Sequence, residues 1–256
     1  MSWNVHGLRG SDGRCDPDRV AAVIAAAAPD VAGLQEVGAP LPTGTAHAGE
    51  ALASRLGMRC AYGPTLRHVR GFAYGNAILS PHPIASFRSY DLSIPGREPR
   101  CCLRADVVVG EARVHVFAAH LGLGWRERRR QAAALLSSDI LRDAALSHPL
   151  VLVGDFNSLS SRSAVPRWLR RQLTDCARAV HNEAPTFPSR FPLLRLDHAY
   201  VSAGLTVRGL EVIRTPLARR ASDHLPLVVE LELSPRARPL PEPRTIETPG
   251  VVTGRP

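Results

Sequence analysis

Short apolar runs separated by turn-forming residues occur along most of this chain, and they predict many strands with a few helices between them. The order of strands and helices is mixed, which argues against a doubly wound parallel sheet. We therefore predict an α/β fold in which two mixed sheets pack face to face with helices outside. Strands are expected at 31–37, 77–80, 103–109, 114–119, 151–153, 195–202, 205–214 and 226–233.

Four helices are expected, at 16–28, 48–56, 125–145 and near 163–173. The first has Asp16 as a candidate N-cap, Pro17 at its first position and Pro29 as its end. The second ends at Gly57, because glycine readily adopts the left-handed conformation that closes a helix.

The chain is expected to form one domain over 1–233, followed by a disordered tail over 234–256 that is rich in Pro and Arg. No apolar stretch has the length and purity of a membrane-spanning helix, and the start shows no signal-peptide pattern. We expect a cytoplasmic monomer without stable membrane insertion. The abrupt start leaves open whether the natural N-terminus lies upstream of Met1.

The net charge is +9, and all 32 basic residues are Arg. Two interpretations stay open: a coding bias toward Arg, and a positive field that attracts a polyanionic or phosphorylated substrate. The composition also avoids Asn, so Asn4, Asn76 and Asn157 are candidates for specific roles. The five cysteines show no C-x-x-C spacing, which argues against a structural zinc site or a disulfide framework.

The apolar runs repeatedly meet carboxylate, amide and imidazole side chains at their ends. Each polar strand end alone is typical of a turn. Together, carboxylate and amide oxygens suit Mg²⁺ or Mn²⁺, and imidazole beside carboxylate suits proton transfer and stabilisation of phosphoryl charge. The set predicts metal-assisted attack of water on a phosphate ester. Its members are Asn4, Glu36, His120, Asp155, Asn157, Asp197, Asp223 and His224.

Seven short motifs over residues 1–233 resemble, in order, those of the endonuclease/exonuclease/phosphatase superfamily. The resemblance implies a four-layer α/β/β/α sandwich of mostly antiparallel sheets and a small, bacterial-type member of this superfamily. The motifs are Ser2-Trp3-Asn4-Val5, Leu34-Gln35-Glu36-Val37, Gly75-Asn76-Ala77-Ile78-Leu79-Ser80, Ala119-His120-Leu121, Gly154-Asp155-Phe156-Asn157, Leu196-Asp197-His198-Ala199 and Ser222-Asp223-His224-Leu225-Pro226.

The resemblance also implies a Mg²⁺- or Mn²⁺-dependent phosphoesterase, acting on a phosphodiester rather than a monoester. Its implied metal ligands are Glu36, with Asn4 as partner, and Asp223. Its implied catalytic residues are Asp155 for the attacking water, Asn157 for the phosphate or the metal, and His224 for the scissile phosphate, with Asp197 holding its far nitrogen. His120 would bind a phosphate oxygen or protonate the leaving group, and Asn76 would support substrate binding.

Several alternatives stay open at this level. The substrate could be DNA, RNA, a phospholipid or a sugar phosphate, and the fold could also serve a non-catalytic module that binds polyanions. The arginines of 126–130 fit either a solvated helix face or a face toward substrate phosphates. Trp3 and Phe156 are expected in the core, and His6, His68 and His198 are expected to be structural.

Overall fold

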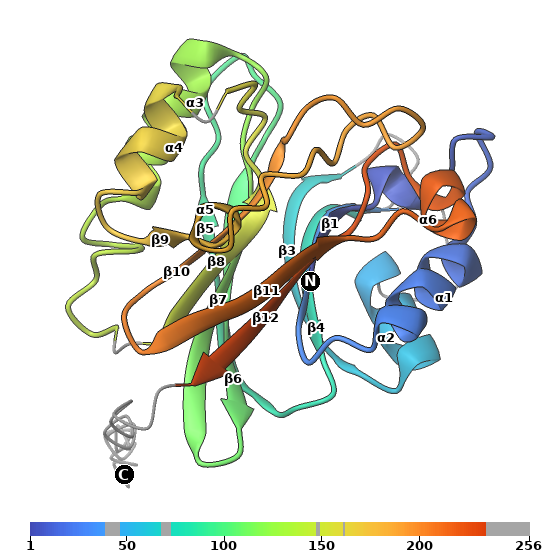
Figure 1. Ribbon diagram of the computed structural model, residues 1–256, viewed down its shortest axis with the longest axis horizontal. Coiled ribbons are helices and arrows are strands. Elements are labelled where there is room, and N and C mark those ends of the chain that lie inside the picture. The colour runs from blue at the N-terminus through green and yellow to red at the C-terminus, as the bar shows by residue number, and fades with distance from the viewer. Residues whose placement is uncertain (39–46, 68–72, 147–148, 161, 234–256) are drawn as a thin grey trace, which may run out of the picture.

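Two six-stranded sheets form the centre of the molecule (Figure 1). The computed structural model describes residues 1–38, 47–67, 73–146, 149–160 and 162–233, so the predicted tail and His68 lie outside the described residues. The first sheet contains, in spatial order, β11 (Leu205–Val212), β12 (Leu227–Leu233), β1 (Ser2–Asn4), β2 (Ala32–Val37), β4 (Ala73–Ser80) and β3 (Arg59–Arg67).

The second sheet contains, in spatial order, β5 (Ile84–Asp91), β6 (Cys101–Val109), β7 (Ala112–His120), β8 (Leu150–Asp155), β10 (Asp197–Val201) and β9 (Thr174–Asp175). Only β1 with β2 and β7 with β8 pair in parallel among the described strands. The predicted pair of mixed, mostly antiparallel sheets is therefore confirmed.

Helices cover the outer faces of both sheets (Figure 1). The helices α1 (Pro17–Ala27), α2 (Ala48–Leu56) and α6 (Pro216–Ala221) lie beside the first sheet, and α3 (Trp125–Leu135) and α4 (Ala164–Leu169) lie beside the second. A short helix, α5 (Cys176–Ala179), follows β9, and a 3₁₀ turn, η1 (His6–Leu8), follows β1. Asp16 caps α1 by accepting a hydrogen bond from the Arg19 N–H, as its sequence position predicts.

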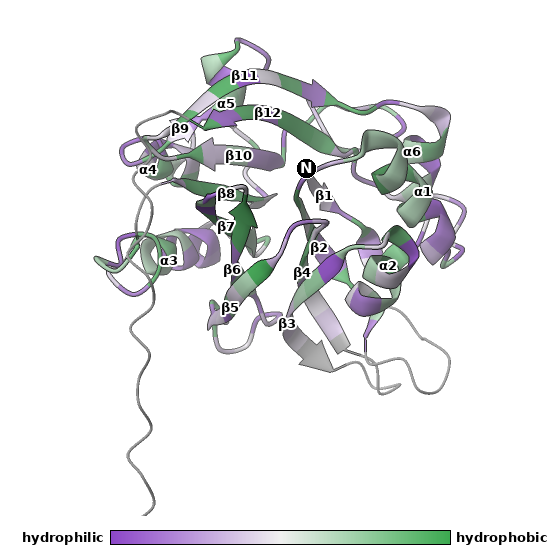
Figure 2. Cartoon of the chain, turned by 90° about the horizontal axis from the view of Figure 1, so that it is seen from below, coloured by the Kyte–Doolittle hydropathy of each residue, from purple (hydrophilic) through white to green (hydrophobic). Residues whose placement is uncertain are grey.

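The second sheet separates two apolar clusters because the side chains of its strands alternate between its faces. In β7, Val116 and Ala118 pack toward the first sheet, whereas Phe117 and Ala119 pack with α3 and α4. Figure 2 shows β7 and β8 coloured mostly as hydrophobic, while the surrounding helices carry hydrophilic segments. Trp3 and Phe156 are fully buried, so their prediction as core residues is confirmed.

The prediction of a helix over 125–145 is wrong in its second half. Helix α3 ends at Leu135, and turns follow. The Ser137 hydroxyl accepts a hydrogen bond from the Asp139 N–H, which is a local alternative to helical hydrogen bonding. The strands β3 and β5 were not predicted, because β5 is mostly exposed and lacks apolar alternation, and β3 is interrupted by Gly63 and Pro64.

No helix in the described part of the chain is both long enough and apolar enough to cross a membrane.

A buried ionic cluster lies on the second sheet, apart from the predicted site. The Asp106 carboxylate accepts hydrogen bonds from Arg104 at 2.8 and 2.9 Å and from the Ser86 hydroxyl at 2.8 Å, and it lies 2.7 Å from His115 Nδ1. Burial by itself would raise the pKa of Asp106, but the hydrogen bonds outweigh it and hold this pKa well below its usual range.

We expect Asp106→Asn to lower the free energy of unfolding by about 2 kcal/mol near pH 7, because it leaves buried donors without their charged partner. The folded-state pKa is below the unfolded one, so the carboxylate stabilises the fold above about pH 4 and this contribution is lost as the pH falls further. Urea unfolding at about pH 7 and about pH 3 measures how the stability loss of the variant depends on pH. Asp139→Asn, at an exposed position, is the control. If Asp106→Asn lowered the free energy of unfolding by the same amount at both pH values, the role given to the Asp106 carboxylate would be contradicted.

Candidate active site

Strand register places three of the predicted catalytic side chains in one row. In the parallel pair of β7 and β8, His120 lies opposite Asp155. In the antiparallel pair of β8 and β10, Asp155 lies opposite Asp197. All three side chains are buried, and they meet at one edge of the second sheet.

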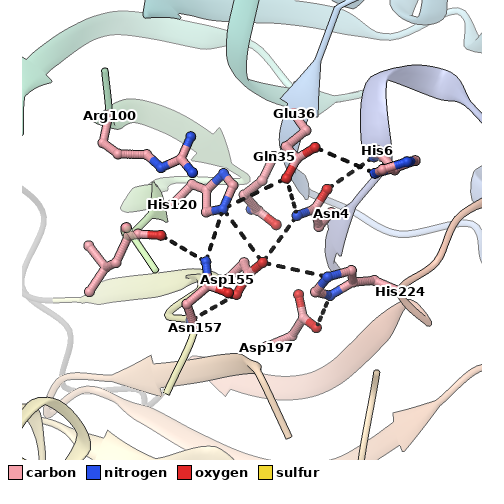
Figure 3. A network of polar contacts seen from close by, with 12 residues as sticks. Asn4, His6, Gln35, Glu36, Arg100, His120, Asp155, Asn157, Asp197 and His224 are labelled. Carbon is pink, nitrogen blue, oxygen red and sulfur yellow. Dashed lines mark hydrogen bonds and ion pairs between the residues drawn. The ribbon is translucent and has the colours of Figure 1, made fainter. Parts of the chain in front are cut away.

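The first sheet reaches the same place through Asn4 and Glu36. Asn4 ends β1 and lies opposite Gln35 of β2, next to Glu36. Its amide nitrogen donates to Glu36 Oε1 at 2.9 Å and to Asp155 Oδ2 at 3.1 Å (Figure 3). One amide therefore joins carboxylates from both sheets, across 151 residues of sequence.

His224 is held by Asp197 in the position that the sequence predicts. Its Nδ1 lies 2.9 Å from Asp197 Oδ2, and its Nε2 lies 3.7 Å from Asp155 Oδ2. The indole of Trp3 donates to the His224 carbonyl at 2.9 Å, and the Phe187 ring packs at 4.8 Å between centroids. These contacts orient the imidazole with Nε2 toward the carboxylate cluster (Figure 3).

Asn157 lies between Asp155 and His120. Its backbone N–H donates to Asp155 Oδ1 at 2.8 Å, and its amide donates to the Leu121 carbonyl at 2.8 Å. The same amide nitrogen lies 3.3 Å from His120 Nε2. His120 Nε2 is also 3.6 Å from Asp155 Oδ2 and 3.8 Å from Glu36 Oε1, so it faces both carboxylates.

The pKa values of the two central carboxylates, Asp155 and Glu36, are shifted in opposite directions. It raises the pKa of Asp155, and the nearby charge of His224 only partly opposes this effect. Burial also acts on Glu36, but the electrostatic influence of the His120 imidazole and hydrogen bonds from Tyr74 and Asn4 outweigh it and lower the Glu36 pKa. Glu36 therefore favours its charged form, whereas Asp155 is able to take up a proton closer to neutral pH.

The two histidines are shifted in opposite directions. Burial lowers the pKa of His120, and the charge of Arg100 lowers it further, so His120 is neutral at pH 7. Burial also acts to lower the pKa of His224, but the charge of Asp197 and its hydrogen bond raise it above its usual range.

Asp197→Asn is expected to lower the pKa of His224 toward its usual value of about 6.5, because the main carboxylate that opposes burial is lost while Asp155 and Asp223 remain. An NMR titration of the imidazole resonances measures this shift. The resonance of His82, which is paired with Asp30 and remote from this pair in sequence, serves as the internal control. An unchanged His224 pKa would contradict the role given to Asp197.

Two predicted residues lie at the margin of this cluster. Asp223 reaches Glu36 only through His6, whose Nδ1 lies 3.6 Å from Asp223 Oδ1 and 3.7 Å from Glu36 Oε2. Asn76 is buried, and its amide donates to the carbonyls of Cys101 at 3.0 Å and Ala118 at 3.2 Å, which ties the two sheets together. Asn76 also lines a small cavity with Glu36 and His120.

Three further side chains belong to the site but were not predicted. His6, expected to be structural, contacts both Glu36 and Asp223. The Tyr74 hydroxyl donates to Glu36 Oε2 at 2.6 Å, and Arg100 lines the small cavity beside His120. His6 and Tyr74 each lie two positions from a motif asparagine, which is a usable signal, whereas Arg100 has no local signal. His198, also expected to be structural, stacks on Tyr200 in the core.

Backbone strain is also found at this site. His6, Glu36 and Asn157 have positive φ angles of 47°, 55° and 48°. Residues other than glycine adopt such angles at a cost of about 1–3 kcal/mol, and they do so mostly where surrounding contacts and function require it. Leu8, Ala28 and His181 also have positive φ, so three of the six such non-glycine residues in the described ranges belong to this cluster.

The donor set fits a hard divalent cation. Glu36 and Asp155 converge on one amide in a largely buried position, and such carboxylates need a positive partner. Among the described residues, no group of three or more His, Cys, Asp or Glu side chains is arranged to hold a metal ion. A cation here would therefore rely on water for most of its ligands, as Mg²⁺ often does. The Asn4 oxygen accepts the His6 N–H at 3.0 Å, so it could serve as a ligand only after its amide rotates.

Comparison with known proteins agrees with the fold and with the motifs. The sequence profile of the "Endonuclease/Exonuclease/phosphatase family" matches residues 1–224. The Escherichia coli K12 protein YbhP is 35% identical over 189 residues, which are 72% of each chain.

Solved structures support the same assignment. An endonuclease/exonuclease/phosphatase from Beutenbergia cavernae superposes with a TM-score of 0.74 and 27% identity, over 91% of this chain and 70% of that one. A mannosyl-6-phosphatase from Bacteroides thetaiotaomicron superposes with a TM-score of 0.71 and 21% identity, over 91% and 98% of the two chains. Because the profile covers nearly all of the described residues and the site geometry accompanies it, the chain belongs to the endonuclease/exonuclease/phosphatase family.

Proposed function

We propose that this protein is a Mg²⁺- or Mn²⁺-dependent hydrolase that cleaves a phosphodiester by attack of a water that Asp155 activates. Family membership supports a phosphoesterase, and the link from Asn4 to both Glu36 and Asp155 carries the proposal at this site. A bound cation would polarise the phosphate oxygens and offset the charge that develops on them. Glu36 would hold it, with Asn4 and Asp223 as further candidates.

Asp155 is suited to accept the proton of the attacking water. Its raised pKa brings its proton affinity closer to neutral pH, which is the condition for an effective general base. The Asn157 N–H holds Oδ1 at 2.8 Å and leaves Oδ2 directed at the cluster. The base is thus oriented before the substrate arrives.

His224 and His120 would act on the phosphate in different ways. His224 carries a proton at neutral pH and directs Nε2 toward Asp155, so it can donate to a phosphate oxygen and stabilise its charge. His120 is neutral, because its pKa is lowered, which favours a hydrogen bond to a phosphate oxygen over protonation of the leaving group. The Asn157 amide beside it can contribute a further hydrogen bond.

An assay with a chromogenic diester, bis(p-nitrophenyl) phosphate, and its monoester tests the proposal, with Mg²⁺, with Mn²⁺ and with EDTA. We expect turnover of the diester that requires the metal and exceeds turnover of the monoester. The mannosyl-6-phosphatase similarity keeps a sugar phosphate as the alternative substrate, and a phospholipid also stays in the panel. Binding of polyanions without turnover under any metal would instead indicate a non-catalytic module.

The positive net charge favours a nucleic acid among the diesters. Affinity for an oligonucleotide should then fall steeply with salt, because each neutralised phosphate releases counterions. Cleavage of single-stranded DNA or RNA at several salt concentrations measures this dependence. A salt-independent rate would favour the small phosphate esters.

A further inference from the structure

An arginine-rich pocket lies outside the catalytic cluster, between two segments that are joined along the chain to residues of that cluster. Its volume is about 500 Å³, and it lies between residues 94–97 and the first turn of α3. Arg97, Arg126 and Arg130 line it, together with Trp125. All three arginines are exposed, and the Trp125 side chain is 59% exposed.

The three guanidinium groups have no acidic partner. Within the described ranges, no carboxylate forms an ion pair with Arg97, Arg126 or Arg130. Glu127 is the only acidic residue in the lining, and its carboxylate is occupied by the Gly124 N–H. Three positive charges against one negative charge leave the pocket with a net charge of about +2.

The two walls of the pocket are tied together before any ligand binds. Gln131 of α3 is almost fully buried, and its Oε1 accepts the Gly122 N–H at 2.8 Å. Its Nε2 donates to the Leu92 carbonyl at 3.2 Å, at the start of the opposite wall. The Arg126 guanidinium also lies over the Trp125 ring, 5.0 Å from its centroid, which restricts its freedom. A ligand therefore meets partly ordered donors and loses less binding energy to ordering them.

Both walls of the pocket are joined along the chain to residues of the candidate active site. The segment that supplies Arg97 ends at Arg100, which lines the small cavity with Glu36 and His120. The other wall begins at Gly124, shortly after His120 along the chain. Figure 3 shows Arg100 next to His120.

We propose that this pocket binds a second phosphate of the substrate, adjacent to the phosphate that is cleaved. Arginine suits this role because its planar fork donates two parallel hydrogen bonds to phosphate oxygens. The inference rests on the proposed function and narrows it to substrates with more than one phosphate. The second phosphate comes either from the neighbouring nucleotide of a strand or from a small bisphosphate.

A matched pair of substrates tests the pocket: the p-nitrophenyl ester of thymidine 5′-phosphate, with and without a 3′-phosphate. The wild type should prefer the 3′-phosphorylated ester by roughly tenfold in kcat/KM, since charge-assisted hydrogen bonds to an exposed phosphate are worth about this much. The variant Arg97→Gln/Arg126→Gln/Arg130→Gln should lose the preference and keep its activity on the ester without the 3′-phosphate. A short single-stranded oligodeoxynucleotide, assayed in parallel, distinguishes a strand from a small bisphosphate.

The control variant is Arg59→Gln/Arg142→Gln/Arg171→Gln, which removes the same charge from exposed arginines outside the pocket. It should keep the preference of the wild type. The proposal would be overturned if the pocket variant preferred the 3′-phosphorylated ester as strongly as the wild type does. It would also be overturned if the control variant lost this preference to the same extent as the pocket variant.

Binding of inorganic pyrophosphate in EDTA, measured by calorimetry, separates this inference from the proposed function. Weaker binding by the pocket variant than by the control variant supports the pocket even if no ester is hydrolysed. Equal binding by the wild type and both variants would count against it whatever the hydrolysis assay shows.

Discussion

Asp155→Asn is expected to lower kcat/KM for the preferred phosphoester by at least about a thousandfold, because it removes the proposed general base and one of the carboxylates that face the candidate cation site. Asn keeps the shape of the side chain and can still accept the Asn157 N–H that Asp155 accepts at 2.8 Å. The site geometry should therefore survive while the chemistry is lost. Steady-state kinetics in excess Mg²⁺ measures the effect.

The same substitution should leave stability unchanged or raise it slightly. Asp155 is buried beside Asp197, and removing its charge relieves desolvation and repulsion. Asp106→Asn is the matched control, since it also changes a buried aspartate but lies outside the site: it should lose stability and keep kcat/KM. If Asp155→Asn instead lost activity and stability in parallel, its role would be structural.

Gly154→Ala is expected to destabilise the fold by about 3 kcal/mol or more, because the added methyl group has no room. A Cβ at this position would lie 1.9 Å from the Ala119 carbonyl oxygen and 2.8 Å from its carbon. The backbone cannot move aside easily, since Gly154 pairs with Ala119 between β7 and β8. The φ of Gly154, 153°, is also one that residues with a side chain rarely adopt.

Gly57→Ala is the control for this prediction. Gly57 also has a positive φ, 64°, but its added Cβ would contact nothing within 4 Å. It should cost only about 1 kcal/mol, which is the usual effect of the left-handed conformation. Urea unfolding of both variants measures the difference. Equal losses would show that the close approach of β7 and β8 is not what requires glycine at 154.

Gly154 explains why the strand that carries Asp155 ends as it does. The strand body packs in the core through Leu152 and Val153, and its tip must approach β7 closely enough to bring Asp155 beside His120. Glycine permits that approach, and Asn157 turns the chain back in the left-handed conformation. The residues proposed for catalysis and the close pairing of β7 with β8 therefore share one short segment.

The sequence by itself determined the elements with strong local signals. Asp16, Pro17 and Gly57 mark the ends of α1 and α2 through capping and backbone preferences, which act within a few residues. The strand ends carrying Asn4, Glu36 and Asp155 were identified because carboxylate and amide side chains recur at the ends of apolar runs, although each such end alone is typical of a turn. Family motifs then indicated which of them belong together.

Only the tertiary structure decided which side chains touch. The register of β7, β8 and β10 sets His120, Asp155 and Asp197 in one row, and register depends on pairings far apart in sequence. Tyr74 reaches Glu36 because β4 pairs with β2, and Arg100 lines the cavity beside His120 without any local sequence signal. The helix predicted over 125–145 was too long, because the apolar periodicity continues to Leu141. In the structure, Ile140 and Leu141 pack against the apolar cluster from turns that follow the end of α3 at Leu135.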